Sequence, residues 1–480
     1  MINKDFLVIT IGKFLQILIL LFTIKLSTYY LSPNEMGKFY IIVTFSSLLM
    51  LSLFNPIGMY VHRNLNMWKE NKIIFNKILF FVLIVLVLAT LSSLIIYFYY
   101  IYIGINIEFS AKEFSIIVFI YSFFVFFSQF IAYVFNMLHF RLIFTILTIS
   151  ISLFSLFFGY LFIKLFGSNA ENWLLGTVVS NMIFMIMGFF ILKNRLNEKF
   201  NGFFYSFKKI KKEKIKSILV FVLPLSVATL FMWLQNSGYR ILIEQNIGLE
   251  FLGFLGVGLA ISGQIASTIE SIVMQYFHPI YYKQITNATI QERKKAIEIF
   301  INKALPIYFM LAIFLTFLAK YVVEILVDEK YYGVYVFTTF GIWIEFFRMS
   351  SNLFGNISQS EMNTKKFMTP YIIGSLVTVF LVYFSSLKVD YEFYLPIALL
   401  IGGLFTMIVM YISMKKLIDF KIDFRLIFFS FLVSLPYFST YLFNFETNLV
   451  LNLLVVGSFG LYFLGTIYFI YKKGLSYGNS

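Results

Sequence analysis

Long apolar runs separated by short polar segments extend along the whole chain. Fourteen runs reach 18 or more residues, and a helix of about 20 apolar residues crosses the hydrocarbon core of a bilayer. The pattern therefore predicts an all-α membrane protein with about fourteen transmembrane helices. The predicted spans are 6–31, 37–61, 78–103, 114–138, 142–164, 172–192, 217–243, 251–277, 301–327, 332–358, 367–387, 391–414, 426–443 and 448–471.

Composition narrows the class of protein further. Of 480 residues, 60% are hydrophobic and only 13% are charged, so a soluble enzyme could not bury the apolar surface. The strands of an outer-membrane barrel would give short alternating segments, which differ from these runs. The chain has no Cys and only three widely separated His residues, so we expect no disulfide, no bound metal and no cofactor.

Charge patterning predicts the orientation of the spans. We place the N-terminus in the cytoplasm and count Lys38, Lys164, Lys303 and Lys320 with the loops beside their spans. Of the 38 Lys and Arg residues, 28 then fall on the inner side, six on the outer side and four within spans. Inner loops of membrane proteins carry an excess of positive charge. The net charge of +15 is therefore a topology signal, and a nucleic-acid partner is not expected. Both termini are predicted to be cytoplasmic.

The loops divide the chain into two similar lobes. We expect a six-helix lobe at 1–192, a basic cytoplasmic linker at 193–216, a second six-helix lobe at 217–414, and two extra helices with a tail at 415–480. The linker could bind anionic lipids at the cytoplasmic face or serve only as a topology anchor. Segments 31–40 and 247–254 look alike at the start of the second span of each lobe, which predicts a parallel pseudo-two-fold repeat.

Polar residues form stripes at helical spacing in several spans, and membrane helices usually turn such stripes toward a cavity or another helix. Lys13 lies on a stripe of the first span, whereas Lys25 lies off it, near the outer end. In the second span a stripe from Thr44 to Gly58 leads to Arg63 at the inner mouth.

The second lobe contributes most of the mid-membrane charge. Arg240 and Glu244 can pair in the seventh span, and Glu345 and Arg348 can pair in the tenth. Glu270, in the eighth span, has no basic residue one turn away on its own helix. Striped helices hold the same positions in both lobes, so we expect a central polar cavity. Such a cavity is typical of an alternating-access transporter, although a buried ion pair can also serve only to hold helices together.

A family resemblance supports this interpretation. It rests on the segments YYLSPNEMGKFY (29–40), NPIG (55–58) followed by HR (62–63), and EKYYGVY (329–335). With the predicted topology, they make the chain similar to Wzx-type flippases for O-antigen or capsule repeat units. These flippases belong to the multidrug/oligosaccharidyl-lipid/polysaccharide exporter superfamily. The resemblance implies a bacterial inner-membrane protein that moves undecaprenyl-pyrophosphate-linked oligosaccharide to the outer leaflet, driven by a proton or sodium gradient. Glycan polymerase machinery would be a partner.

The residues then receive candidate roles. Lys13 and Arg348 would hold the phosphates and Arg240 would guard the outer mouth, with Lys25 and Arg63 as further substrate-binding cations. The carboxylates Glu270, Glu345 and Glu244 would couple ion binding to lobe movement. Three alternatives stay open: a lipid II flippase, a multidrug exporter of the same superfamily, and a membrane glycan polymerase or transferase. The last predicts a long catalytic outer loop, whereas every predicted outer loop is short, so we expect a transporter and not an enzyme.

Overall fold

The computed structural model describes residues 4–105, 107, 109–196, 212–361, 363–442 and 448–476, and within them the fold is helical with no strand. Thirteen helices in these ranges are long and apolar enough to cross a membrane. The further helix Tyr335–Ser360 is 26 residues long and carries the polar residues Glu345, Arg348 and Asn352. Together they confirm the predicted all-α membrane protein with about fourteen spans.

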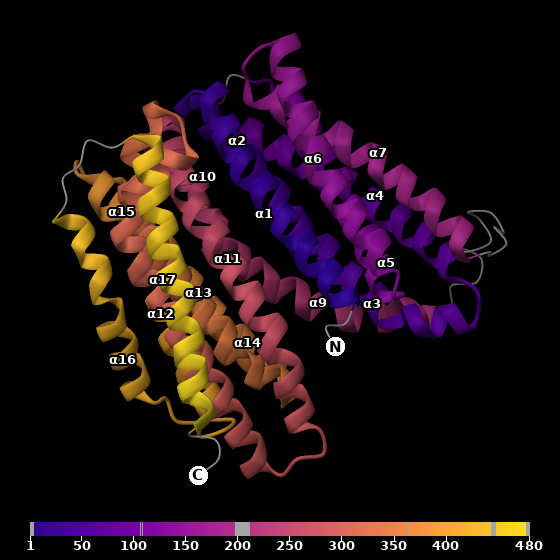
Figure 1. The fold of residues 1–480 in the computed structure, drawn as a ribbon. Coiled ribbons are helices and arrows are strands. Elements are labelled where there is room, and N and C mark those ends of the chain that lie inside the picture. The colour runs from indigo at the N-terminus through magenta and orange to yellow at the C-terminus, as the bar shows by residue number, and fades with distance from the viewer. Residues whose placement is uncertain are drawn as a thin grey trace. The chain divides into compact units, whose positions relative to one another are not determined.

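The chain forms two compact units, Met1–Gly253 and Phe254–Ser480. The first unit contains every helix up to the first turn of α11 and therefore includes the seventh predicted span (Figure 1). The predicted division at the linker 193–216 stays a prediction, and most of that linker lies outside the described residues. The elements are α1 (Lys4–Tyr30), α2 (Pro33–Leu49), η1 (Met50–Phe54), α3 (Asn55–Glu70), α4 (Ile74–Ile103), α5 (Ala111–Met137), α6 (Arg141–Phe166), α7 (Ala170–Leu196), α9 (Lys212–Trp233), η2 (Leu234–Gly238), α10 (Tyr239–Asn246) and α11 (Leu249–Ile285).

The second unit holds the remainder of α11 and the helices that follow it. The two-stage helix α16–η4 corresponds to the thirteenth predicted span, and its second stage begins next to Pro436. Proline lacks the N–H that an α-helix needs in its interior, so a change of helix type at this position is expected. The elements are α12 (Ile290–Leu326), η3 (Glu329–Val334), α13 (Tyr335–Ser360), α14 (Thr364–Ser386), α15 (Tyr391–Lys415), α16 (Phe424–Ser434), η4 (Leu435–Tyr441) and α17 (Leu449–Ser476).

Capping residues fix several helix starts. Ser32 accepts a hydrogen bond from the backbone N–H of Glu35, and Pro33 occupies the first helical position of α2. Ser110 with Glu113, and Thr289 with Glu292, form capping boxes at α5 and α12. Because these side chains satisfy backbone N–H groups that have no partner within the helix, each helix begins at a defined residue.

Two spans of the first unit contain a π-helical turn. The turn η1 interrupts the second span, and η2 interrupts the seventh. A π turn accommodates one extra residue, which rotates the following helix by about 100° relative to regular α spacing. The predicted stripe from Thr44 to Gly58 assumed regular spacing. The Thr44 carbonyl accepts a hydrogen bond from Trp233 of α9, and Gly58 faces Phe126 and Phe130 of α5. The continuous stripe stays a prediction.

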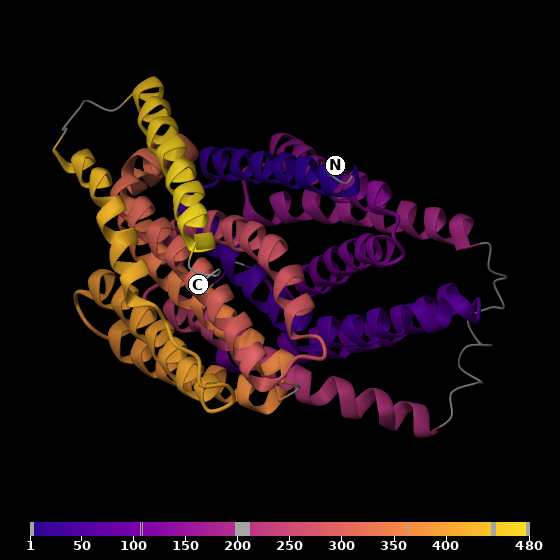
Figure 2. The same ribbon diagram turned by 60° about the horizontal axis from the view of Figure 1, so that its bottom comes forward.

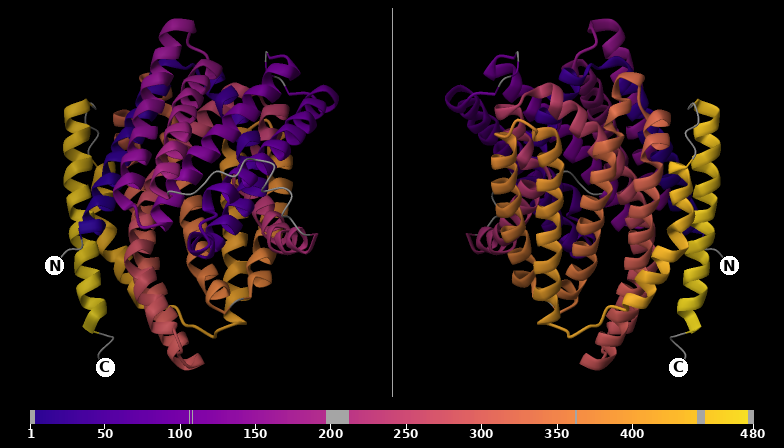
Figure 3. Two further views of the ribbon diagram at one scale, coloured as in Figure 1. Left: turned by 90° about the vertical axis from the view of Figure 1, so that its right-hand side faces the viewer. Right: turned by 90° about the vertical axis from the view of Figure 1, so that its left-hand side faces the viewer.

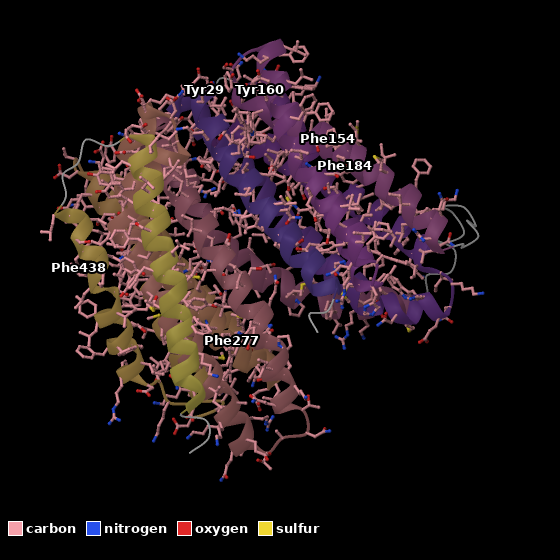
Figure 4. All side chains as sticks on the ribbon, viewed as in Figure 1. Tyr29, Phe154, Tyr160, Phe184, Phe277 and Phe438 are labelled. Atoms are coloured by element: carbon pink, nitrogen blue, oxygen red, sulfur yellow. The ribbon has the colours of Figure 1, made fainter. Side chains whose placement is uncertain are left out.

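Small and polar side chains pack the helices of the first unit. Ser128 of α5 donates to the Asn181 side chain of α7, and Ser180 donates to the Ile151 carbonyl of α6. At one end of α1 and α6, Tyr29 and Tyr160 lie close together, with Tyr30 between them (Figure 4). The helix α9 runs beside α3 and η1 (Figure 2). Hydrogen bonds and small residues replace the hydrophobic effect in holding helices together in lipid.

The first turns of α2 and α11 touch through their backbones. A Cβ atom on Gly37 would lie 2.0 Å from the Leu249 carbonyl oxygen, and a Cβ on Gly253 would lie 1.9 Å from the Pro33 carbonyl oxygen. Each carbonyl belongs to the residue four positions before the other glycine, so the contact is reciprocal. All four residues lie in the first unit and within the two segments that predicted the repeat. Only glycine fits at either position.

The second unit is built around α12, α13 and the α14–α15 pair (Figure 3). Gly402 of α15 lies directly against Thr378 of α14, which allows a close approach. The C-terminal elements α16, η4 and α17 pack on α12. A buried hydrogen bond from Asn452 of α17 to the Glu324 carboxylate of α12 holds one end of this interface.

Candidate functional site

A charged cluster lies between α11 and α13 in the second unit. The guanidinium of Arg348 donates through Nε to Glu345 Oε2 at 2.6 Å and through Nη2 to Glu270 Oε2 at 2.8 Å. The side chains of Arg348, Glu345 and Glu270 are 25%, 19% and 14% exposed. The structure thus brings together three of the predicted residues, and it gives Glu270 a basic partner from a different helix.

Neutral side chains complete the cluster. Asn352 donates to Glu270 Oε1 at 3.0 Å, and the Tyr371 hydroxyl of α14 donates to Asn352 Oδ1 at 2.8 Å. Tyr308 of α12 is fully buried, and it lies close enough to Glu270 and Arg348 to interact with them electrostatically. Its hydroxyl has no hydrogen-bond partner among the described residues. A buried hydroxyl without a partner beside charged groups is a possible point of contact for a ligand.

The balance of charge indicates what this cluster can do. Two carboxylates face one guanidinium, so with every group ionised the three residues carry a net charge of −1. A partly buried excess charge costs free energy unless a counter-ion or a proton neutralises it. Because Nε and Nη2 of Arg348 are already bonded to carboxylates, the arrangement suits uptake of a proton or a monovalent cation better than capture of an anion.

The cluster belongs to a longer polar seam between α11 and α13. From one end to the other, the Thr338 hydroxyl donates to the Gly258 carbonyl, Arg348 meets Glu270, His278 meets Asn356, and Tyr281 donates to Ser360. The partners are separated by 80, 78, 78 and 79 residues. This nearly constant separation means that the two helices run parallel and pair in register over most of their length. Phe277, next to His278, marks this part of α11 in Figure 4.

In the first unit, Arg240 lies among aromatic rings. Its guanidinium carbon is 5.1 Å from the centre of the Tyr40 ring and 6.0 Å from that of Tyr239. Its buried Nε has no hydrogen-bond partner among the described residues. Glu244, one turn along α10, is only 1% exposed. A guanidinium held over aromatic faces keeps N–H groups available for an anion.

The remaining predicted cations lie on other elements of the first unit. Lys13 is half-buried on α1, next to Gly12, which packs against Thr145 of α6. Lys25 is half-buried nearer the end of α1. Arg63 is exposed and lies 5.5 Å from the centre of the Phe221 ring of α9.

Several residues around these charges could not be found from spacing along one helix. Tyr40, Tyr308 and Tyr371 reach the charged groups from neighbouring helices, and aromatic residues make up 21% of the chain. With so many aromatic residues, the sequence does not single out individual tyrosines as site residues. Asn352 lies one turn beyond Arg348 on α13, but its link to Glu270 depends on how α11 packs.

Comparisons with known proteins show which solved structures share this fold. No protein-family model and no curated protein sequence matches the chain. The structure is similar to lipid II flippase MurJ in an inward closed conformation, with a TM-score of 0.67 and 16% identity, covering 98% of this chain and 99% of that one. It is also similar to a multidrug resistance MATE family transporter of the MOP superfamily in its inward-facing conformation. That match has a TM-score of 0.55 and 15% identity and covers 87% and 98% of the two chains.

The outward-facing conformation of a MATE family transporter of the MOP superfamily gives a TM-score of 0.53 with 15% identity over 86% and 94% of the two chains. The chain shares the fold of these proteins over at least 86% of its length. It is a multi-pass membrane protein whose structural neighbours are flippases and transporters. Because a shared fold at 15–16% identity carries no information on the transported molecule, the substrate has to be argued from the residues.

Proposed function

We propose that the chain is a flippase that moves undecaprenyl-pyrophosphate-linked oligosaccharide, an O-antigen or capsule repeat unit, from the inner to the outer leaflet. The observation that carries this proposal is the similarity to a lipid II flippase over 98% of the chain. The half-buried cations in the membrane helices add to it. A lipid-linked pyrophosphate needs positive charge at membrane depth, whereas its lipid tail can remain in the bilayer.

In this proposal Arg240 and Lys13 bind the pyrophosphate. Arg240 lies over Tyr40 and Tyr239, and its Nε has no hydrogen-bond partner in the part of the chain that the structure describes, which supports an anion-binding role. Lys13 has no ion pair within the described part of the chain. Lys25 and Arg63 would attract the headgroup at the two ends of the path. The two carboxylate partners of Arg348 favour a role in ion coupling over the phosphate binding that the sequence predicts.

The cluster of Glu270, Glu345 and Arg348 would couple transport to an ion gradient. Uptake of a proton or a sodium ion would neutralise its excess negative charge. Binding of the ion would weaken the ion pair between Arg348 and one of the two carboxylates. The packing of α11 against α13 would then become weaker. Glu244 would act as a secondary acidic group next to Arg240.

The positive-inside pattern supports a cytoplasmic-membrane location with both termini inside. Anionic lipids would contact the basic linker, and glycan polymerase machinery would receive the product on the outer side. The lipid contact follows from the positive charge of the linker, and the polymerase partner follows from the chemistry of the proposed substrate.

Complementation of a flippase-null strain tests the proposal. We expect the wild-type chain to restore surface glycan, and Arg240→Ala or Lys13→Ala to leave lipid-linked oligosaccharide in the inner leaflet at normal protein level. Lys320→Ala, which removes an exposed lysine of α12, is the matched control. Full glycan with Arg240→Ala would remove that residue from the mechanism, and failure of the wild-type chain would argue against the substrate class.

A lipid II flippase is the second candidate, because the similarity to MurJ favours it directly. Rescue of a strain depleted of its lipid II flippase, without rescue of the surface-glycan mutant, would select it. A multidrug exporter is supported by the MATE similarity and predicts resistance to cationic drugs on overexpression. A glycan polymerase or transferase lacks support, since the similar structures are those of transporters.

A further inference from the structure

His278 lies on the polar seam of the second unit, outside the charged cluster. It follows Glu270 by eight residues on α11, which is about 12 Å along the helix axis. Its Nε2 is 2.6 Å from the Asn356 Oδ1 atom of α13. The imidazole also packs against Tyr282 of its own helix and Phe300 of α12. Contacts from three helices thus fix the ring in one orientation.

The hydrogen bonds around Asn356 determine which atom of the pair donates. The Asn356 Nδ2 group donates to the carbonyls of Asn352 and Leu353, at 3.0 and 3.1 Å. The Oδ1 atom, which can only accept, therefore faces His278. Consequently Nε2 of His278 must carry the proton and donate, whether the imidazole is neutral or charged.

The same bonds connect His278 to the charged cluster. Asn356 is fixed to the carbonyl of Asn352, one turn earlier, and the Asn352 side chain donates to Glu270. Each donor along this path points toward the Glu270 carboxylate. The carbonyl and the side-chain amide of Asn352 are joined only by covalent bonds within that residue. The three hydrogen bonds therefore fix the position of Asn352 relative to Glu270 and do not form one unbroken chain.

We propose that His278 is a positioning residue for the ion-coupling site, resting on the proposed function of the Glu270 cluster. Its donated bond holds the turn from Asn352 to Asn356 in register with α11. That register keeps the Asn352 amide on Glu270. Without a donor at this position, the Oδ1 atom of Asn356, a residue that is 3% exposed, loses its partner, and the turn shifts to regain one.

Three substitutions separate a hydrogen-bonding role from simple packing. His278→Phe keeps a ring but removes the donor, whereas His278→Gln places an amide N–H close to the position of Nε2. His62→Phe is the matched control, because the His62 ring stacks on Phe130 and its Nε2 has no partner among the described residues. All three are made in the otherwise unchanged chain.

The readout is the ion concentration, proton or sodium, that gives half-maximal transport. We expect His278→Phe to shift it by about tenfold, as for a lost bond to a charged network. His278→Gln and His62→Phe should stay within about twofold of wild type. An equal shift for His278→Phe and His278→Gln would overturn the proposal, since packing alone would then explain it.

A second measurement does not depend on transport. Thermal unfolding of the purified protein is recorded for His278→Phe, Asn352→Ala and the double variant. We expect clearly non-additive shifts in melting temperature, because both changes remove hydrogen bonds that fix Asn352 relative to Glu270, whereas His62→Phe with Asn352→Ala should be additive. Additivity in the first pair would overturn the link even if transport of another substrate were found.

Discussion

The helix α11 makes two contacts of opposite character with its neighbours. Its first turn meets α2 through backbone atoms at Gly37 and Gly253, where no side chain fits between the helices. Further along, it meets α13 through charged and polar side chains centred on Arg348. The first contact tolerates no added atom, whereas the second tolerates no lost charge. One membrane helix is thus held by close backbone packing at one end and by electrostatic interactions in its middle.

The largest expected effect comes from breaking the electrostatic contact. Arg348→Met would leave Glu270 and Glu345 without their cation, and we expect a destabilisation of about 3 kcal/mol. Chemical unfolding of the detergent-solubilised protein measures it. Adding Glu270→Gln and Glu345→Gln to the variant should recover much of the loss, because no charge is then left unpaired.

The control for this prediction is Lys294→Met. Lys294 lies 4.0 Å from the exposed Asp419, and removal of such a surface pair should change stability by less than about 1 kcal/mol. Equal losses for Arg348→Met and Lys294→Met would contradict the assigned importance of the cluster.

The backbone contact should respond to a single methyl group. Gly37→Ala and Gly253→Ala would each push α2 and α11 apart, and we expect each to cost about 2 kcal/mol, although alanine favours helix by about 1 kcal/mol. Gly457→Ala, at a position with no atom within 4 Å, should not destabilise the protein. The double variant should cost less than the sum of the single ones, because the first methyl already opens the contact. Strict additivity would mean that the two glycines act separately.

The smallest effects distinguish the two tyrosines beside the cluster. Tyr371→Phe removes a donor to Asn352 and should cost about 1 kcal/mol. Tyr308→Phe removes a hydroxyl that has no hydrogen-bond partner among the residues described, so the free energy of unfolding should change by less than about 0.5 kcal/mol. If the Tyr308 hydroxyl contacts the coupling ion, the ion dependence of transport should change in Tyr308→Phe while stability stays constant. A large loss of stability would point to a structural role.

The sequence was sufficient to predict the spans because lipid demands a helix of apolar residues for each crossing. The helix α13 illustrates how far this reasoning extends: its apolar ends identified it as a span despite Glu345 and Arg348. Pairing within one helix could also be read from spacing. The bond from Arg348 to Glu270 could not, because it depends on the register between α11 and α13. The turn η1 was missed for a similar reason, since no residue type marks an extra residue in a helix.

The two π turns, η1 and η2, have a mechanical consequence. Each holds one residue more than a regular helix would, and that surplus is confined to a single turn. If the turn reverted to α geometry, the extra residue would shift along the helix, and the segment on one side of it would rotate about the helix axis. The helices α3 and α10, which carry His62 and Arg240, follow these turns directly. Each helix could therefore rotate about its own axis without unfolding a helical turn.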